Sequence, residues 1–155
     1  MTDDMTRLAL LANAASTFML VGLIWFVQVV HYPQFAAIGA DRFMRCQADN
    51  VRLTARVVAL PMLVEAATSA ILAWKPPSKD LELLCWSGFS MVVLIWVSTA
   101  VLQVPRHNAL ATGFDPKAHR GLAMSNWIRT VAWSVRGVLV LYLINQMVER
   151  GPGNG

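Results

Sequence analysis

Two side chains of opposite charge, Glu65 and Arg136, lie inside apolar stretches that are long enough to be membrane-spanning helices. A charge at hydrocarbon depth is costly unless it is paired or hydrated, so such residues are candidates for a functional site. Glu65 or His107 could act as an acid or base, while arginines hold an anion, enolate or quinone-like oxygen through charge-assisted hydrogen bonds. The competing interpretation is that the pair only joins two helices.

Helical spacing groups further polar side chains with these charges. At about 100° per residue, four residues of the last apolar segment and its approach fall within an arc of about 80°. They are Asn126, Arg129, Trp133 and Arg136. Glu65 is nine residues past Arg56, or about 13 Å, and Arg136 is seven past Arg129, or about 10 Å. The two charges therefore lie at comparable depths, and we expect the polar faces to converge inside a bundle.

The predicted site has two candidate catalytic residues and seven candidate binding residues. The catalytic candidates are Glu65 and His107. The binding candidates are Gln28, His31, Gln103, Asn108, Asn126, Arg129 and Arg136. We expect no metal and no cofactor: His31 and His107 are the residues that could bind haem or a metal ion, but no close histidine pair or His/Cys spacing supports this.

The composition requires a membrane to position these residues. The chain has 155 residues, of which 56% are hydrophobic and only 14% are charged, which is too apolar for a soluble domain. Apolar segments at 8–30, 57–74, 83–104 and 131–148 are each long enough to cross a hydrocarbon core of about 30 Å. The sequence thus predicts an all-α bundle of four transmembrane helices in one domain over residues 1–150, followed by a disordered tail at 151–155.

The distribution of basic residues predicts an orientation. Segments 31–56 and 105–130, expected as loops, carry eight Lys and Arg residues, and the other side carries four. Basic loops stay in the cytoplasm, so we expect a multi-pass protein of the cell membrane with both termini outside. The expected partners are the lipid bilayer and a small aromatic or quinone-like ligand. Nothing in the sequence suggests nucleic-acid binding, and the oligomeric state is left open.

The two halves of the chain read as copies of one helical hairpin. Leu23-Ile24-Trp25 followed by Pro33 matches Leu94-Ile95-Trp96 followed by Pro105. The offset between matched positions drifts only from 71 to 77 along the chain. Two tandem copies would run in the same direction, related by an axis along the membrane normal.

A motif in the second half carries a family resemblance. Val104 to Ala111 reads VPRHNALA, and Asn126 to Thr130 reads NWIRT. This pattern resembles the signature of the anthrone-oxygenase-like family of small four-helix membrane proteins, with His107 standing where the pattern more usually has Asn. The resemblance implies a four-helix membrane fold and cofactor-independent oxidation of an aromatic substrate.

We therefore expect a pocket that opens toward the cytoplasm and oxidises or binds a small aromatic or quinone-like molecule. The alternative is a non-enzymatic membrane subunit, or a lipid- or quinone-binding module, in which Glu65 and Arg136 are a structural helix lock.

Overall fold

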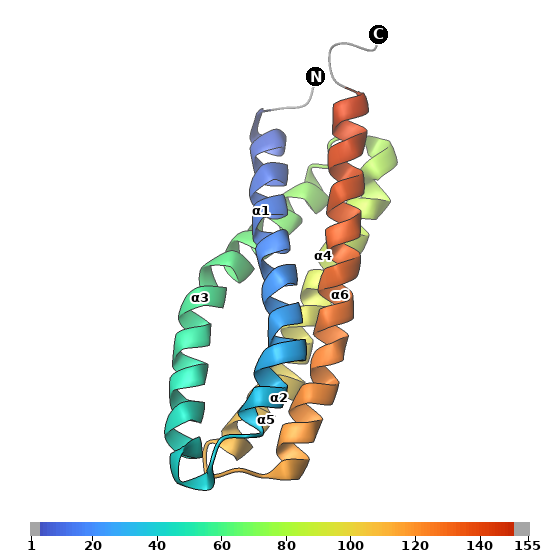
Figure 1. The fold of residues 1–155 in the computed structure, drawn as a ribbon. Helices are drawn as coiled ribbons and strands as arrows, with labels where there is room; N and C mark the ends of the chain where they lie inside the picture. The colour runs from blue at the N-terminus through green and yellow to red at the C-terminus, as the bar shows by residue number, and fades with distance from the viewer. Residues whose placement is uncertain (1–3, 151–155) are drawn as a thin grey trace.

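Four long helical rods run side by side in the computed structural model, which describes residues 4–150 (Figure 1). The first rod is α1 (Asp4–Phe26), η1 (Val27–His31) and α2 (Tyr32–Phe35), and the second is α3 (Ala40–Trp74). The third is η2 (Lys79–Leu81), α4 (Glu82–Ser98), η3 (Thr99–Gln103) and α5 (Val104–Leu110), and the fourth is α6 (Pro116–Glu149). The described residues contain no strand, so the predicted all-α four-helix bundle is confirmed; segment 151–155 lies outside them.

All four rods are long and apolar enough to cross a membrane, which identifies a membrane protein. The rods also extend beyond the apolar segments, because α6 alone has 34 residues and so rises about 51 Å against about 30 Å of hydrocarbon. The expectation of long loops at 31–56 and 105–130 is therefore wrong. The true turns cover only 36–39 and 111–115, since arginine and other polar residues continue a helix readily once it leaves the lipid.

The turn before α6 shows how the sequence ends one rod and begins the next. Gly113 has a φ of +148°, and it is the one positive φ in the part of the chain that the structure describes. Asp115 then caps α6, because its side chain accepts a hydrogen bond from the backbone N–H of Lys117 at 2.8 Å. Pro116 follows at the first helical position, where no N–H is needed.

Each of two rods widens for one turn just before a proline. Tyr32 donates its backbone N–H to the carbonyl of Val27, and Val104 donates to Thr99, so both bonds span five residues instead of four. Pro33 and Pro105 follow directly; they have no N–H, and in a regular helix their rings would clash with the carbonyl four residues back. A wider π turn relieves this clash, and such turns are frequent at functional sites.

The apolar core is divided along the bundle by polar layers. One cluster of buried residues, around Leu10 and Leu143, fills the end where α1 begins and α6 ends. A second, around Leu20 and Trp133, fills the middle, and an aromatic cluster around Phe43 fills the end near α2 and α5. Both rod ends that lead to the termini lie together at the top of Figure 1. The polar layers between these clusters contain the candidate site.

Candidate functional site

Most of the sequence-predicted residues lie in one of two places in the bundle. One is a closed polar cluster at mid-bundle, which we call the ionic network and which consists of Asn13, Thr17, Glu65, Ser69, Gly88, Trp133 and Arg136. The other is a cavity closer to α2 and α5. Glu65 and Arg136 belong to the ionic network and do not line the cavity, so the expectation that all the polar residues border one pocket is wrong.

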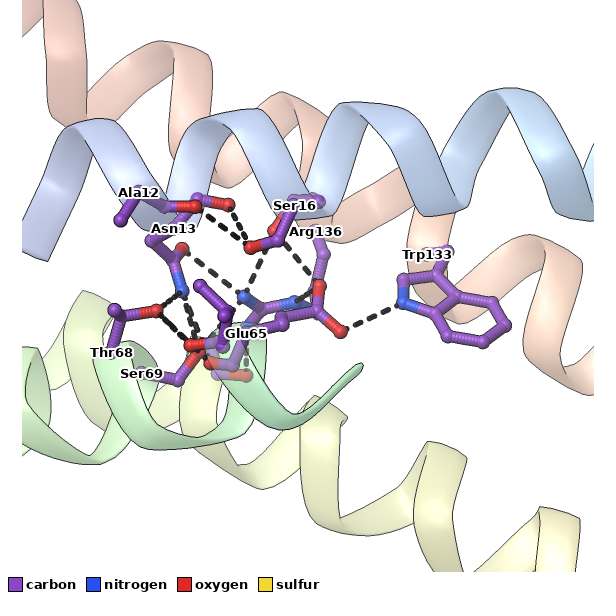
Figure 2. Close-up of polar contacts among 11 residues, drawn as sticks. Ala12, Asn13, Ser16, Glu65, Thr68, Ser69, Trp133 and Arg136 are labelled. Carbon is purple, nitrogen blue, oxygen red and sulfur yellow. Dashed lines mark hydrogen bonds and ion pairs between the residues drawn. The ribbon is translucent and has the colours of Figure 1, made fainter. Parts of the chain in front are cut away.

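The carboxylate of Glu65 accepts three hydrogen bonds from two neighbouring helices. Its Oε1 accepts from Thr17 Oγ1 at 2.8 Å and from Arg136 Nε at 3.0 Å. Its Oε2 accepts from Trp133 Nε1 at 3.0 Å, on the opposite side of the carboxylate (Figure 2). Glu65 is only 1% exposed, so these three donors occupy most of the acceptor capacity of a carboxylate that a ligand could otherwise use.

The guanidinium of Arg136 is held from every helix that it faces. Nη2 donates to Ser69 Oγ at 3.0 Å and to Asn13 Oδ1 and Thr17 Oγ1 at 3.3 Å each. Nη1 donates to the backbone carbonyl of Gly88 on α4. Asn13 in turn donates its amide to Thr68 and Ser69 of α3, as Figure 2 shows. The pair therefore ties α1, α3, α4 and α6 together, which is the arrangement that a buried charge needs to be tolerated.

Gly88 provides a local test of this packing. A Cβ at position 88 would lie 3.3 Å from Arg136 Nη1, which is tighter than normal contact. We expect Gly88→Ala to destabilise the protein by about 1–3 kcal/mol because the guanidinium must move away from its acceptors. Gly22→Ala is the matched control, since a Cβ there meets nothing within 4 Å. It should stabilise by about 0.5–1 kcal/mol through helix propensity. Unfolding in detergent measures both; equal effects would contradict the tight packing at Gly88.

The cavity has a volume of about 200 Å³ and is bordered by all four rods. Its wall is mainly apolar, with Leu20 and Ile24 from α1 and Val58 and Met62 from α3. On the α3 side, Val51, Thr54 and Ala55 are exposed, whereas Asn50, Val58 and Met62 are half-buried.

Four of the predicted site residues come together at this cavity: His31, Gln103, His107 and Arg129. Three of them carry a buried polar atom without a hydrogen-bond partner in the described chain: His31 Nε2, Gln103 Oε1 and Arg129 Nε. Buried polar groups are nearly always paired, and each exception needs an explanation. All three residues border the same cavity.

The remaining binding candidates lie elsewhere. Asn126 donates its amide to Gln28 Oε1 at 2.8 Å, and Gln28 donates to the carbonyl of Ala123 at 3.2 Å, so these two residues join η1 to α6. Neither lines the cavity. Asn108 is exposed on α5. Their prediction as lining residues of the cavity is therefore wrong, because Gln28 and Asn126 bond to each other between two helices and Asn108 faces outward.

Trp133 contacts both the ionic network and the cavity. Its ring borders the cavity and lies 5.4 Å from the guanidinium carbon of Arg129, within range of a cation–π contact. Its Nε1 donates to Glu65, as described above. The other tryptophans near this level, Trp25, Trp96 and Trp127, are 40–42% exposed, which is typical of an interfacial belt. Only Trp133 among these four is buried as a pocket wall.

Sequence reasoning missed several polar partners, among them Asn13, Thr17 and Gln47. Asn13 and Thr17 are one helical turn apart within an apolar run, and this spacing could have indicated a polar face toward Glu65. Gln47 is completely buried and contacts His107, and nothing in the sequence distinguishes it from an exposed residue of a polar helix.

No protein-family model, no curated protein and no solved structure matches this chain. Within residues 4–150, no three His, Cys, Asp or Glu side chains gather as metal ligands would. The functional argument therefore rests on the geometry of the cavity.

Proposed function

We propose that this protein binds a small, largely apolar ring molecule in the cavity between its four rods. The observation that carries the proposal is the combination of an apolar wall with three unpaired buried polar atoms from His31, Gln103 and Arg129. Ligand sites have this composition: mostly apolar lining and a few convergent polar groups that orient the ligand. A dry cavity of about 150 Å³ is known to accept benzene, so about 200 Å³ suits one or two fused rings.

The same proposal assigns a place in the membrane. The chain is a multi-pass protein of the cell membrane, with turns 36–39 and 111–115 in the cytoplasm and both termini outside. The excess of basic residues near those turns supports this orientation. The cavity then lies at the cytoplasmic boundary of the bilayer, where an amphipathic quinone-like molecule partitions.

The proposal also includes an internal duplication of one helical hairpin. Its support is the pair of π turns, Val27–His31 and Thr99–Gln103, each followed two residues later by a proline. His31 and Gln103 occupy the last position of their π turns and both border the cavity. The ligand would thus sit between the two copies of the hairpin.

The enzymatic form of this function is oxidation of the bound ring without a cofactor, as the resemblance to the anthrone-oxygenase-like family implies. The non-enzymatic form is a membrane subunit, or a lipid- or quinone-binding module, that holds the molecule unchanged. Recovery of the bound compound after incubation in air distinguishes the two, because only an enzyme returns it altered. In both forms the Glu65–Arg136 pair is a helix lock, supported by its closed hydrogen bonding.

Calorimetric titration with 1,4-naphthoquinone, of the protein in lipid nanodiscs, tests the proposal. We expect saturable binding at one site per chain. Ala55→Phe places a ring into the cavity from the exposed α3 side, so it should abolish saturable binding and leave only partition into lipid.

Ala67→Phe is the matched control, because Ala67 is exposed on the same helix and does not border the cavity. It should bind as the unaltered protein does. If the isotherm of the unaltered protein equals that of Ala55→Phe, the cavity is not a binding site for such rings.

A further inference from the structure

The two ring nitrogens of His107 have different surroundings. Nδ1 lies 3.1 Å from Nε2 of Gln47, and this same Nε2 lies 3.1 Å from the backbone oxygen of His107. Gln47, on α3, is fully buried. The other nitrogen, Nε2 of His107, has no hydrogen bond within residues 4–150, and the ring borders the cavity. Gln47 itself does not border the cavity.

The backbone carbonyl fixes the orientation of the Gln47 amide. A carbonyl oxygen only accepts hydrogen bonds, so the amide atom that faces it must be the nitrogen. The reverse orientation would put two acceptor oxygens 3.1 Å apart. Because the amide nitrogen only donates, the Nδ1 atom beside it must accept. In a neutral imidazole whose Nδ1 accepts, the proton is on Nε2.

We propose that Gln47 is a positioning residue that holds His107 as the Nε2–H tautomer, so that the cavity selects ring molecules carrying an oxygen acceptor. This inference rests on the proposed ligand-binding function and deepens it. It makes His107 a hydrogen-bond donor to the ligand and not a base. Arg129 supplies a second donor, because its buried Nε–H has no partner in the described chain.

Nε2 of His107, at the cavity, and the buried Nε of Arg129 discriminate between ligands according to which ligand gives them an acceptor. A ligand with a carbonyl or carboxylate oxygen satisfies them, whereas a pure hydrocarbon of the same shape leaves both without a partner. A hydrogen bond from the neutral imidazole of His107 should favour the oxygen-bearing ring by about fivefold, and one from the charged guanidinium of Arg129 by about 10- to 100-fold. The two bonds together predict a preference of roughly 50- to 500-fold for the oxygen-bearing ring.

The first test reads the tautomer directly and needs no ligand. Nitrogen-15 NMR of histidine-labelled protein at pH 8 distinguishes a protonated ring nitrogen from an unprotonated one, and His107→Asn identifies the signals of His107. We expect His107 protonated at Nε2 in the unaltered protein. Gln47→Glu should move the proton to Nδ1, since a carboxylate accepts. Gln47→Met should remove the preference without adding charge.

Gln34→Glu is the matched control for the added charge, because Gln34 is exposed on α2 and should leave His107 unchanged. A His107 protonated at Nδ1 in the unaltered protein would overturn the role of Gln47. Thermal unfolding of each variant shows whether it is folded. If Gln47→Glu is misfolded, the Gln47→Met variant decides the role of Gln47 in its place.

The second test compares 1-indanone with indane, which share one bicyclic skeleton and differ in a carbonyl. We expect the unaltered protein to prefer 1-indanone by roughly 50- to 500-fold, and the Gln47→Met variant to lose about fivefold of this preference. Equal saturable binding of both compounds overturns the selectivity. If neither compound binds, the proposed function itself is refuted. The tautomer measurement then still decides the role of Gln47.

Discussion

Replacing Arg136 by Gln should lower the free energy of unfolding by about 3–5 kcal/mol, because it leaves the Glu65 carboxylate buried without its counter-charge. Glu65 is 1% exposed and Arg136 is 2% exposed, so water cannot compensate for the loss. Titration with a denaturing detergent, followed by circular dichroism, measures the change. Glu65→Gln should have a cost of the same order, since Arg136 then keeps its hydroxyl, amide and carbonyl acceptors but no anion.

The double variant isolates the pair from its surroundings. Glu65→Gln combined with Arg136→Gln should cost less than the sum of the two single variants, because neither charge is left alone. Arg150→Gln is the surface control: Arg150 lies 3.4 Å from exposed Asp80, and an exposed pair contributes only about 0–1 kcal/mol. An Arg136→Gln protein as stable as Arg150→Gln would show that the ionic network does not hold the helices together.

Replacing Arg129 by Gln should weaken 1,4-naphthoquinone binding by about 10- to 100-fold, since a hydrogen bond from a charged donor is worth about 1.5–3 kcal/mol. The buried Nε–H of Arg129 faces no acceptor in the described chain, so a quinone oxygen would supply one. The same variant should barely change stability, because the protein offers this guanidinium only a 3.4 Å hydrogen bond to Thr99 and the face of Trp133. Calorimetry in nanodiscs and unfolding in detergent measure the two effects separately.

Arg120→Gln is the matched control for Arg129→Gln, because Arg120 is exposed on the same helix, α6. It removes the same charge near the same membrane surface and should leave affinity unchanged. If both variants weaken binding equally, then general attraction by surface charge, and not a contact in the cavity, explains the effect of Arg129. Loss of stability in Arg129→Gln without a loss of affinity would instead assign Arg129 to the scaffold.

The position of Trp133 makes the two experiments informative together. Its indole donates to Glu65 on one side and borders the cavity and Arg129 on the other. A disturbance of the ionic network is therefore transmitted to the pocket wall by direct contact. Glu65→Gln keeps an acceptor oxygen for Trp133, so we expect it to preserve ligand affinity in the protein that remains folded.

The sequence by itself determined the class of molecule and the charges that had to be explained. Four apolar segments of sufficient length require membrane-spanning helices, since only a helix satisfies its own backbone in lipid. Glu65 and Arg136 at similar depth, with opposite signs, made an ion pair geometrically possible but did not decide it, and the structure contains one at 3.0 Å. Helical spacing also placed His31, Gln103, His107 and Arg129 at one level of the bundle, where they border one cavity.

Only the tertiary structure decided that the ion pair and the cavity are separate. Spacing gives the face of a helix on which a residue lies, but not the neutral partners that neighbouring helices bring to it. Asn13, Thr17 and Ser69 close the network around Arg136, and the hydrogen bond between Asn126 and Gln28 joins side chains 98 positions apart. The contact of Gln47 with His107 joins side chains 60 positions apart. Such contacts depend on how four rods rotate and tilt against one another, which periodicity within a single helix does not specify.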